Sequence, residues 1–172
     1  LQTVPIINSP IQITAIEVWL SNRTNKTEGS RDILALLDLA EKNTYNSNIT
    51  GNTTALYPHT RITNGINASS SNNLLELLGE NGRNPNNNFV QSIFANAGDT
   101  DNYTKLSSAQ KLVENQDFSV NRRLGYISLS FPLHEDQVLA VSYRYIANGV
   151  EYQVGELSTD VPFDATSPKM LY

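Results

Sequence analysis

The sequence contains no cysteine, and histidine, methionine and tryptophan are scarce. The absence of cysteine excludes a disulfide framework, a cysteine-ligated zinc site and a thiol nucleophile. The two histidines, His59 and His134, are far apart in the sequence and neither has a helical partner at metal-binding spacing. No stretch approaches the roughly 18 consecutive apolar residues that indicate a membrane helix. We therefore expect no direct bilayer insertion by this segment.

Basic residues are outnumbered, with 12 Lys and Arg against 17 Asp and Glu and a net charge of -5. Nucleic acids and anionic membrane surfaces are bound by clustered basic side chains, so neither is an expected partner. The 172 residues, 39% of them hydrophobic, are enough for one domain with its own core. We expect a single soluble domain over residues 1–172, cut from a much larger chain.

Two apolar patterns open the chain. Residues 11–20 alternate as a β-strand does, with one face formed by Ile16, Val18 and Leu20 and the other by Glu17 and Trp19. Residues 31–41 follow Ser30, a good helix N-cap, and carry apolar side chains at helical spacing. They predict an amphipathic helix packed on the sheet through Ile33, Leu36, Leu37 and Ala40.

The middle of the chain is polar. Residues 44–71 are rich in Asn, Thr and Ser and predict a long loop, the part least protected from hydrogen exchange. Short helices are predicted over residues 73–78, before Gly79, and over residues 88–97. A third is predicted over residues 107–115, because Ser107 and Gln110 have the spacing of a capping box.

The last third predicts strands over residues 127–133 and 138–146. Asn148-Gly149 is the preferred dipeptide of a type I′ hairpin turn, and it places Tyr145 opposite Tyr152 and Tyr143 opposite Val154. The expected fold class is α+β, with a mainly antiparallel sheet, helices packed on one side and long polar loops. The sheet would combine the N-terminal strand with a C-terminal meander that contains the Asn-Gly hairpin.

Few residues point to chemistry. His134 with Glu135 and Asp136 has the composition of a weak metal site, but an exposed turn is the favoured interpretation. Asp99, Asp101 and Asn102 resemble the start of a calcium loop that lacks its later Gly and distal Glu. No nucleotide-binding or hydrolase motif is present, although a catalytic set assembled only in space stays open. We therefore assign no catalytic, cofactor-binding or metal-binding residue and expect no cofactor.

Two surface features have alternative interpretations. Asn-x-Ser/Thr sequons are glycan acceptors in a secreted eukaryotic protein but also arise by chance in an Asn-rich chain; they lie at Asn22, Asn25, Asn48, Asn52, Asn67 and Asn102. An aromatic set would suit sugar stacking if it were exposed; the set is Trp19, Tyr126, Tyr143, Tyr145 and Tyr152. We favour the interpretation that Tyr143, Tyr145 and Tyr152 are half-buried ladder residues of the sheet.

Both ends of the chain resemble one known family. The motifs are ITAIEVWLSNRT and SRDILALLDLAE near the start, and LGYISLSFPL, DQVLAVSYRY and YQVGELSTDV near the end. They look like the SprA family, the large outer-membrane translocon of the type IX secretion system that is linked to gliding motility. The resemblance implies a soluble domain that decorates a giant β-barrel through which folded proteins pass. It supplies no catalytic motif. Because it implies a bacterial protein, it favours chance as the origin of the sequons.

The expected function is therefore a non-enzymatic structural or gating domain of that protein-transport channel at the cell outer membrane. It would face the extracellular or the periplasmic side, and its partners would be other parts of the translocon, its subunits and secreted cargo. The alternative from another class is a cell-surface adhesion or carbohydrate-binding module. A hydrolase with a spatially assembled site is a weaker third.

Overall fold

The described part of the chain is mainly antiparallel sheet. The computed structural model describes residues 10–22, 28–54, 71–86, 88–95, 102–166 and 168–172. The larger sheet has the order β2-β3-β1-β6-β7; its strands are β1 Ile11–Leu20, β2 Ser30–Leu36, β3 Tyr103–Lys111, β6 Leu139–Ala147 and β7 Val150–Val154. A separate hairpin consists of β4 Phe118–Asn121 and β5 Tyr126–Leu129. The helices are short: α1 Leu74–Leu78, the 3-10 turn η1 Asn81–Arg83 and α2 Phe89–Ile93.

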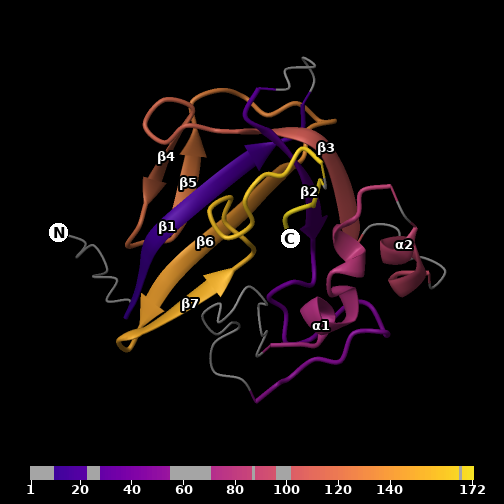
Figure 1. Cartoon of the computed structure of the whole chain (residues 1–172). Helices are drawn as coiled ribbons and strands as arrows, with labels where there is room; N and C mark the ends of the chain where they lie inside the picture. Colours follow the sequence, from indigo (N-terminus) through magenta and orange to yellow (C-terminus); the bar gives the residue numbers. More distant parts are fainter. Residues whose placement is uncertain (1–9, 23–27, 55–70, 87, 96–101, 167) are drawn as a thin grey trace.

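The larger sheet opens into two arms. β1 pairs with β6 along its whole length, as expected for an N-terminal strand that joins the C-terminal sheet. With β3 it pairs only at Trp19↔Lys111 and Leu20↔Gln110. One arm is therefore β1-β6-β7, the other is β2-β3, and they join at one corner and then diverge (Figure 1). The chain beyond β7 crosses in front of the sheet in that view and ends between the arms.

The helix predicted over residues 31–41 is wrong, because residues 30–36 form β2. Ile33 and Leu34 are consecutive and both buried, at 4% and 0% exposure, so they face opposite sides of the strand. Leu37, expected in the core, follows the strand and is 58% exposed. Burial on both faces produces an apolar run without alternation, which a helical pattern imitates.

The helix predicted over residues 107–115 is also wrong, because residues 103–111 form β3. The register shifts between Arg31↔Ala109 and Ile33↔Leu106, so β3 carries one residue more than β2 between these pairs. Ser108 has a φ of 52° there, and its N–H donates to Asp32 Oδ1 at 2.8 Å. The serines that imitate a capping box therefore form a β-bulge.

The other two predicted helices are confirmed, but both are shorter than predicted. α1 lies within residues 73–78 and is followed by Gly79 at a φ of 47°. α2 covers Phe89–Ile93 of the expected 88–97, whose last two residues lie outside the described part. α1, α2 and η1 contact one another. The expected layer of helices across one side of the sheet is not confirmed.

The Asn-Gly hairpin is confirmed in type and register. Asn148 and Gly149 have φ values of 51° and 78°, and Tyr145 pairs with Tyr152 as Tyr143 does with Val154. The rings of Tyr145 and Tyr152 stack with centroids 5.3 Å apart. The expected C-terminal meander is wrong, since β5 is shorter than residues 127–133 and pairs with β4 rather than β6.

Gly149 is the position where this turn requires glycine. A Cβ there would meet no atom within 4 Å, so only the positive φ opposes another residue. Gly149→Ala is expected to lower the free energy of unfolding by about 1–2 kcal/mol, the cost of the left-handed region for an L-residue. Urea denaturation checks this, with Asn148→Gly as the control that should leave the midpoint nearly unchanged.

Two cores lie on opposite faces of β2. The large core contains Leu34 and joins the sheet, the short helices and the chain end; among its fully buried members are Leu74, Leu78, Val90, Ala147 and Met170. The small core contains Ile33 and lies between the arms; it consists of Trp19, Ile33, Leu106, Ala109 and Leu171. Successive side chains at the chain end also point to opposite sides, so that Met170 and Tyr172 lie in the large core and Leu171 lies in the small one.

The start of the predicted polar loop is held by side-chain amides. Asn72 donates through Nδ2 to the carbonyl oxygens of Asp38 and Glu41 at 2.6 and 2.8 Å. The Asp38 carboxylate, fully buried, accepts the N–H groups of Tyr45 and Asn46. Residues 55–70 lie outside the described part, so the low exchange protection of the loop stays a prediction.

Candidate functional site

The predicted metal and calcium candidates do not come together in the described residues. His134 is exposed in the turn before β6, where its N–H donates to Gln137 Oε1. No group of three or more His, Asp or Glu side chains placed to hold a metal is found among the described residues. His59, Asp99 and Asp101 lie outside the described part, and Asn102 is buried with its carbonyl accepting the N–H of Leu37.

Four of the six sequon asparagines lie in the described part of the chain. Asn25 and Asn67 lie outside the described residues. Asn48 donates its amide to the carbonyl of Ile93 at 2.7 Å, and Asn102 is 7% exposed. Burial of Asn102 favours the chance interpretation for that position, whereas Asn48 lies at the surface with its amide hydrogen-bonded. Asn52 is exposed and Asn22 is partly exposed.

Part of the aromatic set lines a groove. Tyr126, Tyr143 and Tyr145 border a groove of about 550 Å³ between the β4–β5 hairpin and the β1–β6 surface. The other lining residues are apolar or glycine: Ile11, Ile13, Ile16, Val120, Gly125, Ile127 and Val141. Tyr152 stacks on Tyr145 without lining the groove, and Trp19 belongs to the small core on the other face. The alternative of a stacking platform is therefore met only in part, whereas Tyr143 and Tyr152 are partly buried ladder residues, as favoured.

The walls of this groove, which we call the tyrosine groove, are apolar and aromatic. No acidic, basic or histidine side chain lines it in the described part of the chain. Burial raises the pKa of Tyr143, so its phenol stays neutral and can donate or accept a hydrogen bond. The volume lies within the range of small-ligand sites, and the walls offer ring faces and hydroxyls.

The nearest arrangement to a catalytic nucleophile is at Ser158. Its Oγ donates to Glu17 Oε1 at 2.8 Å and lies 3.1 Å from Lys111 Nζ, which itself donates to Glu17 Oε1 at 2.6 Å. Burial alone would raise the pKa of Glu17, but the hydrogen bonds from Lys111 and Ser158 outweigh it and lower the pKa. A carboxylate with a lowered pKa is a poor base for activating a hydroxyl. The cluster instead ties the chain beyond β7 to β1 and β3.

This pairing predicts a pH dependence. Because the folded-state pKa of Glu17 is lowered from about 4.5, its stabilising contribution is present above that value and is lost as the pH falls through the lowered pKa. The stability difference between the wild type and Glu17→Gln should therefore be constant near neutral pH and shrink below about pH 4.5. Urea denaturation at a series of pH values measures it, with Glu135→Gln in an exposed turn as control. A difference that widens toward acid pH would contradict the assignment.

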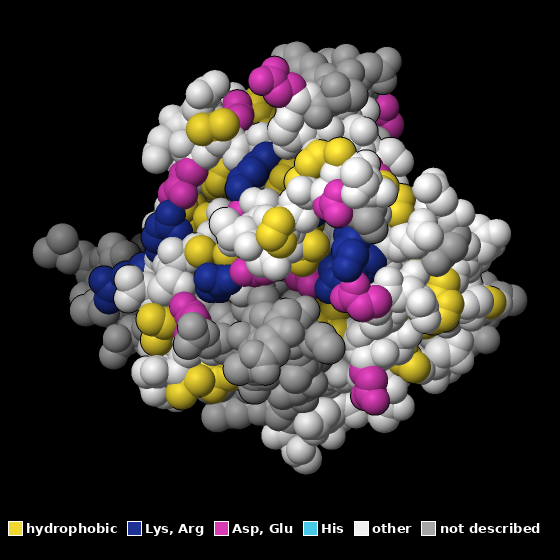
Figure 2. Space-filling view, in the orientation of Figure 1, with side chains coloured by type: hydrophobic (Ala, Val, Ile, Leu, Met, Phe, Trp, Pro, Cys, Tyr) yellow, Lys and Arg dark blue, Asp and Glu magenta, His cyan; other side chains and the backbone are white. Residues whose placement is uncertain are grey.

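Two further clusters hold the same segment. Arg144 donates to Asp160 Oδ1 and Gln153 Oε1, and Gln153 donates to Asp160 Oδ2 at 2.8 Å. Arg31 donates to the carbonyl of Val161 at 2.9 Å. On the face of the molecule in Figure 2, basic and acidic side chains accordingly lie next to one another where this segment crosses the sheet. The charges there are largely engaged with each other.

The most buried ion pair anchors the chain end. Arg83 donates two hydrogen bonds to Glu156, at 2.7 and 2.6 Å, and the two residues are 6% and 3% exposed. Burial alone would lower the pKa of Arg83, but the hydrogen bonds and charge of Glu156 outweigh it and raise the pKa. Glu156 also accepts the N–H of Tyr172 at 3.0 Å, and the Tyr172 ring lies 4.4 Å from the Arg83 guanidinium.

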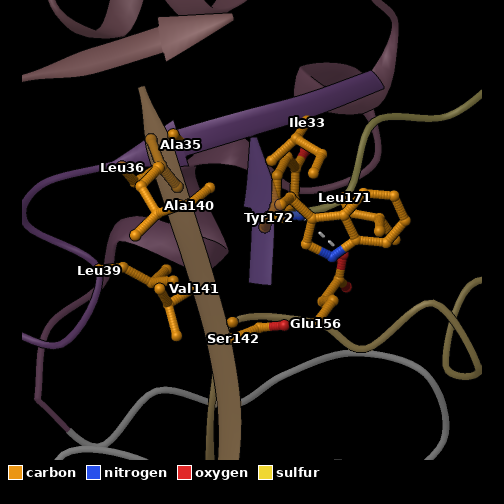
Figure 3. Close-up of a pocket in the computed structure, with 13 residues that line it drawn as sticks. Ile33, Ala35, Leu36, Leu39, Ala140, Val141, Ser142, Glu156, Leu171 and Tyr172 are labelled. Atoms are coloured by element: carbon orange, nitrogen blue, oxygen red, sulfur yellow. Dashed lines mark hydrogen bonds between the residues drawn. The ribbon is translucent and has the colours of Figure 1, made fainter. Parts of the chain in front are cut away.

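A small cavity of about 140 Å³ lies between the arms next to this anchor. Figure 3 shows Ala140, Val141 and Ser142 following one another along β6. Leu171, Tyr172 and Glu156 lie beside this strand, and Ile33 lies next to Leu171. Trp19 Nε1 and Ser142 Oγ belong to its lining residues and have no hydrogen-bond partner among the described residues. A polar cavity of this size suits ordered water.

Sequence reasoning missed every one of these clusters. Their members lie far apart in the chain, as in Glu17 with Ser158 and Arg83 with Glu156, and no local spacing relates them. The only local signal was the tyrosine alternation of residues 143–154, which did find part of the groove.

No helix among the described residues is long and apolar enough to cross a membrane. No family model and no curated protein matches the chain.

Proposed function

We propose that this chain is a non-enzymatic domain that acts by contact, as a structural or gating part of an SprA-like outer-membrane translocon of the type IX secretion system. The observation that carries the non-enzymatic part is how the ionisable side chains of the described residues are used. Glu17 and Arg144 hold the segment beyond β7 on the sheet, and Arg83 joins that segment to η1. None of them faces the tyrosine groove.

The translocon part of the proposal rests on the resemblance of the two ends. The motifs that carry it form β1, β2, β6 and β7 of the larger sheet and β5 of the separate hairpin. Short helices packed against that sheet complete the proposed α+β domain. Its partners would be other parts of the translocon, its subunits and secreted cargo, on the extracellular or periplasmic side of the outer membrane. Residues 44–71 are the proposed contact with cargo or a subunit, as loops on a rigid scaffold often are.

The test removes the proposed contact surface, and the folded-protein level shows whether the fold survives the loss of the buried Asn46 and Ile49. Residues 44–71 would be deleted in the full-length parent protein, and secretion and folded-protein level would both be measured. We expect reduced secretion at normal protein level. As a matched control, Leu133→Ser changes an exposed apolar residue outside these surfaces. Normal secretion at normal level would remove residues 44–71 from the mechanism.

The tyrosine groove favours one second candidate, a carbohydrate-binding module. Tyr126 is 53% exposed and lies on the rim of a groove that also contains Tyr143. Glycan-array binding by the domain that is lost in Tyr126→Ser would establish this candidate and displace the first. Tyr45→Ser, which alters a tyrosine that is 73% exposed outside the groove, is the control.

A further inference from the structure

We propose that the gap between the two arms of the sheet is a strand-acceptor site. Residues 170–172 occupy it in cis, and an extended segment of another polypeptide with an aliphatic and then an aromatic side chain would occupy it in trans. This goes beyond the proposed function and stands whether or not the parent protein is a translocon.

The main-chain contacts are those of strand addition. Leu34 donates to the carbonyl of Leu171 at 2.8 Å, and Leu171 donates to the carbonyl of Asp32 at 3.0 Å. The bridge Ile33↔Leu171 is parallel, and β2 is the edge strand of its arm. On the other side, the N–H of Glu156, just beyond β7, donates to the carbonyl of Tyr172 at 2.7 Å. Such backbone contacts bind an extended chain whatever its sequence.

Side-chain pockets add selectivity. Leu171 is 1% exposed and fills the small core beside Ile33. Tyr172 lies over Arg83 and donates its hydroxyl to the carbonyl of Gly79 at 2.6 Å. A Cβ on Gly82 would lie 2.7 Å from that hydroxyl, so glycine leaves room for the ring. The site therefore selects an aliphatic residue followed by an aromatic one.

The occupying residues are arranged as a tethered ligand. Residues 162–166, 168 and 169 are exposed, and residues 170–172 are buried directly after them. The described contacts of residues 170–172 join them to the two arms, Gly79 and Arg83. A strand from another chain would make the same contacts by displacing residues 170–172. The tether gives the cis segment an effective concentration on the order of millimolar, so a competing strand must overcome it.

The test uses the full 172-residue chain with Tyr172→Ala or Leu171→Asp, and a fluorescent peptide with the sequence of residues 164–172. The peptide is expected to raise the Tm of both variants with increasing concentration, as a ligand of the folded state does. Its fluorescence anisotropy should saturate. The wild type should bind it at least about 100-fold more weakly, because its site is already filled. A peptide carrying Leu171→Asp is the control and should have no effect.

Each outcome decides the proposal. Folded variants whose Tm does not respond to the peptide, or responds equally to the control peptide, overturn it. If a variant is unfolded alone, recovery of its far-UV circular dichroism on adding the peptide supports the site. Failure to recover counts against it. Loss of secretion function in the parent would bear only on the translocon proposal, so the two fail separately.

Discussion

Arg83→Met is expected to lower the free energy of unfolding by about 3–5 kcal/mol, because it leaves the buried carboxylate of Glu156 without its partner. Both residues are almost inaccessible, and two short hydrogen bonds join them. The substitution also removes the cation beneath the Tyr172 ring and a donor to the Met170 carbonyl. Equilibrium unfolding in urea measures the loss.

Two further variants distinguish the loss of the buried ion pair from the loss of an arginine side chain alone. Arg83→Met with Glu156→Leu should recover much of the loss, since removing both charges also removes the desolvation penalty. Arg122→Met breaks a pair with Glu114 in which the side chains are 38% and 32% exposed. That control should cost less than about 1 kcal/mol. If Arg83→Met and Arg122→Met had equal effects, the buried pair would not be the anchor described here.

Leu34→Ala is expected to cost about 2–5 kcal/mol, whereas Leu37→Ala should change stability by less than about 0.5 kcal/mol. Leu34 is fully buried in the large core and Leu37 is 58% exposed. An amphipathic helix over the same residues gives the opposite ranking, with Leu37 in the core. The pair of substitutions therefore tests β2 directly, with thermal and urea denaturation as the readout. A large loss of stability in Leu37→Ala would contradict β2 and favour the predicted helix.

The misassigned β2 shows where local patterns fail. Ile33 and Leu34 bury opposite faces in two cores, so the strand has no polar face and its apolar spacing matches a helix. Leucine-rich residues favour a helix intrinsically, and only the pairing of β2 with β3 overrides that preference. That partner is remote in the sequence and was itself read as a helix.

The Asn148-Gly149 hairpin was predictable for the opposite reason. The dipeptide sets the turn, the turn sets the register, and both strands lie within ten residues of it. The β4–β5 hairpin lacked so strong a dipeptide, and its positive φ falls on Gly125 alone. For the site, only the tyrosines of β6 carry a local signal. The ion pairs become visible once distant segments are placed side by side.

The order in which this chain is made sets a limit on when it can fold. β1 pairs with β6, which is synthesised only after most of the sequence. Until then the backbone N–H and C=O groups of β1 that bond to β6 have no partner in the sheet. Residues 170–172, which join the two arms, are later still. Pairings of such long sequence separation form slowly and leave apolar strands open to aggregation in the meantime. A chaperone that shields the first forty residues during synthesis would therefore be expected to raise the yield of folded protein.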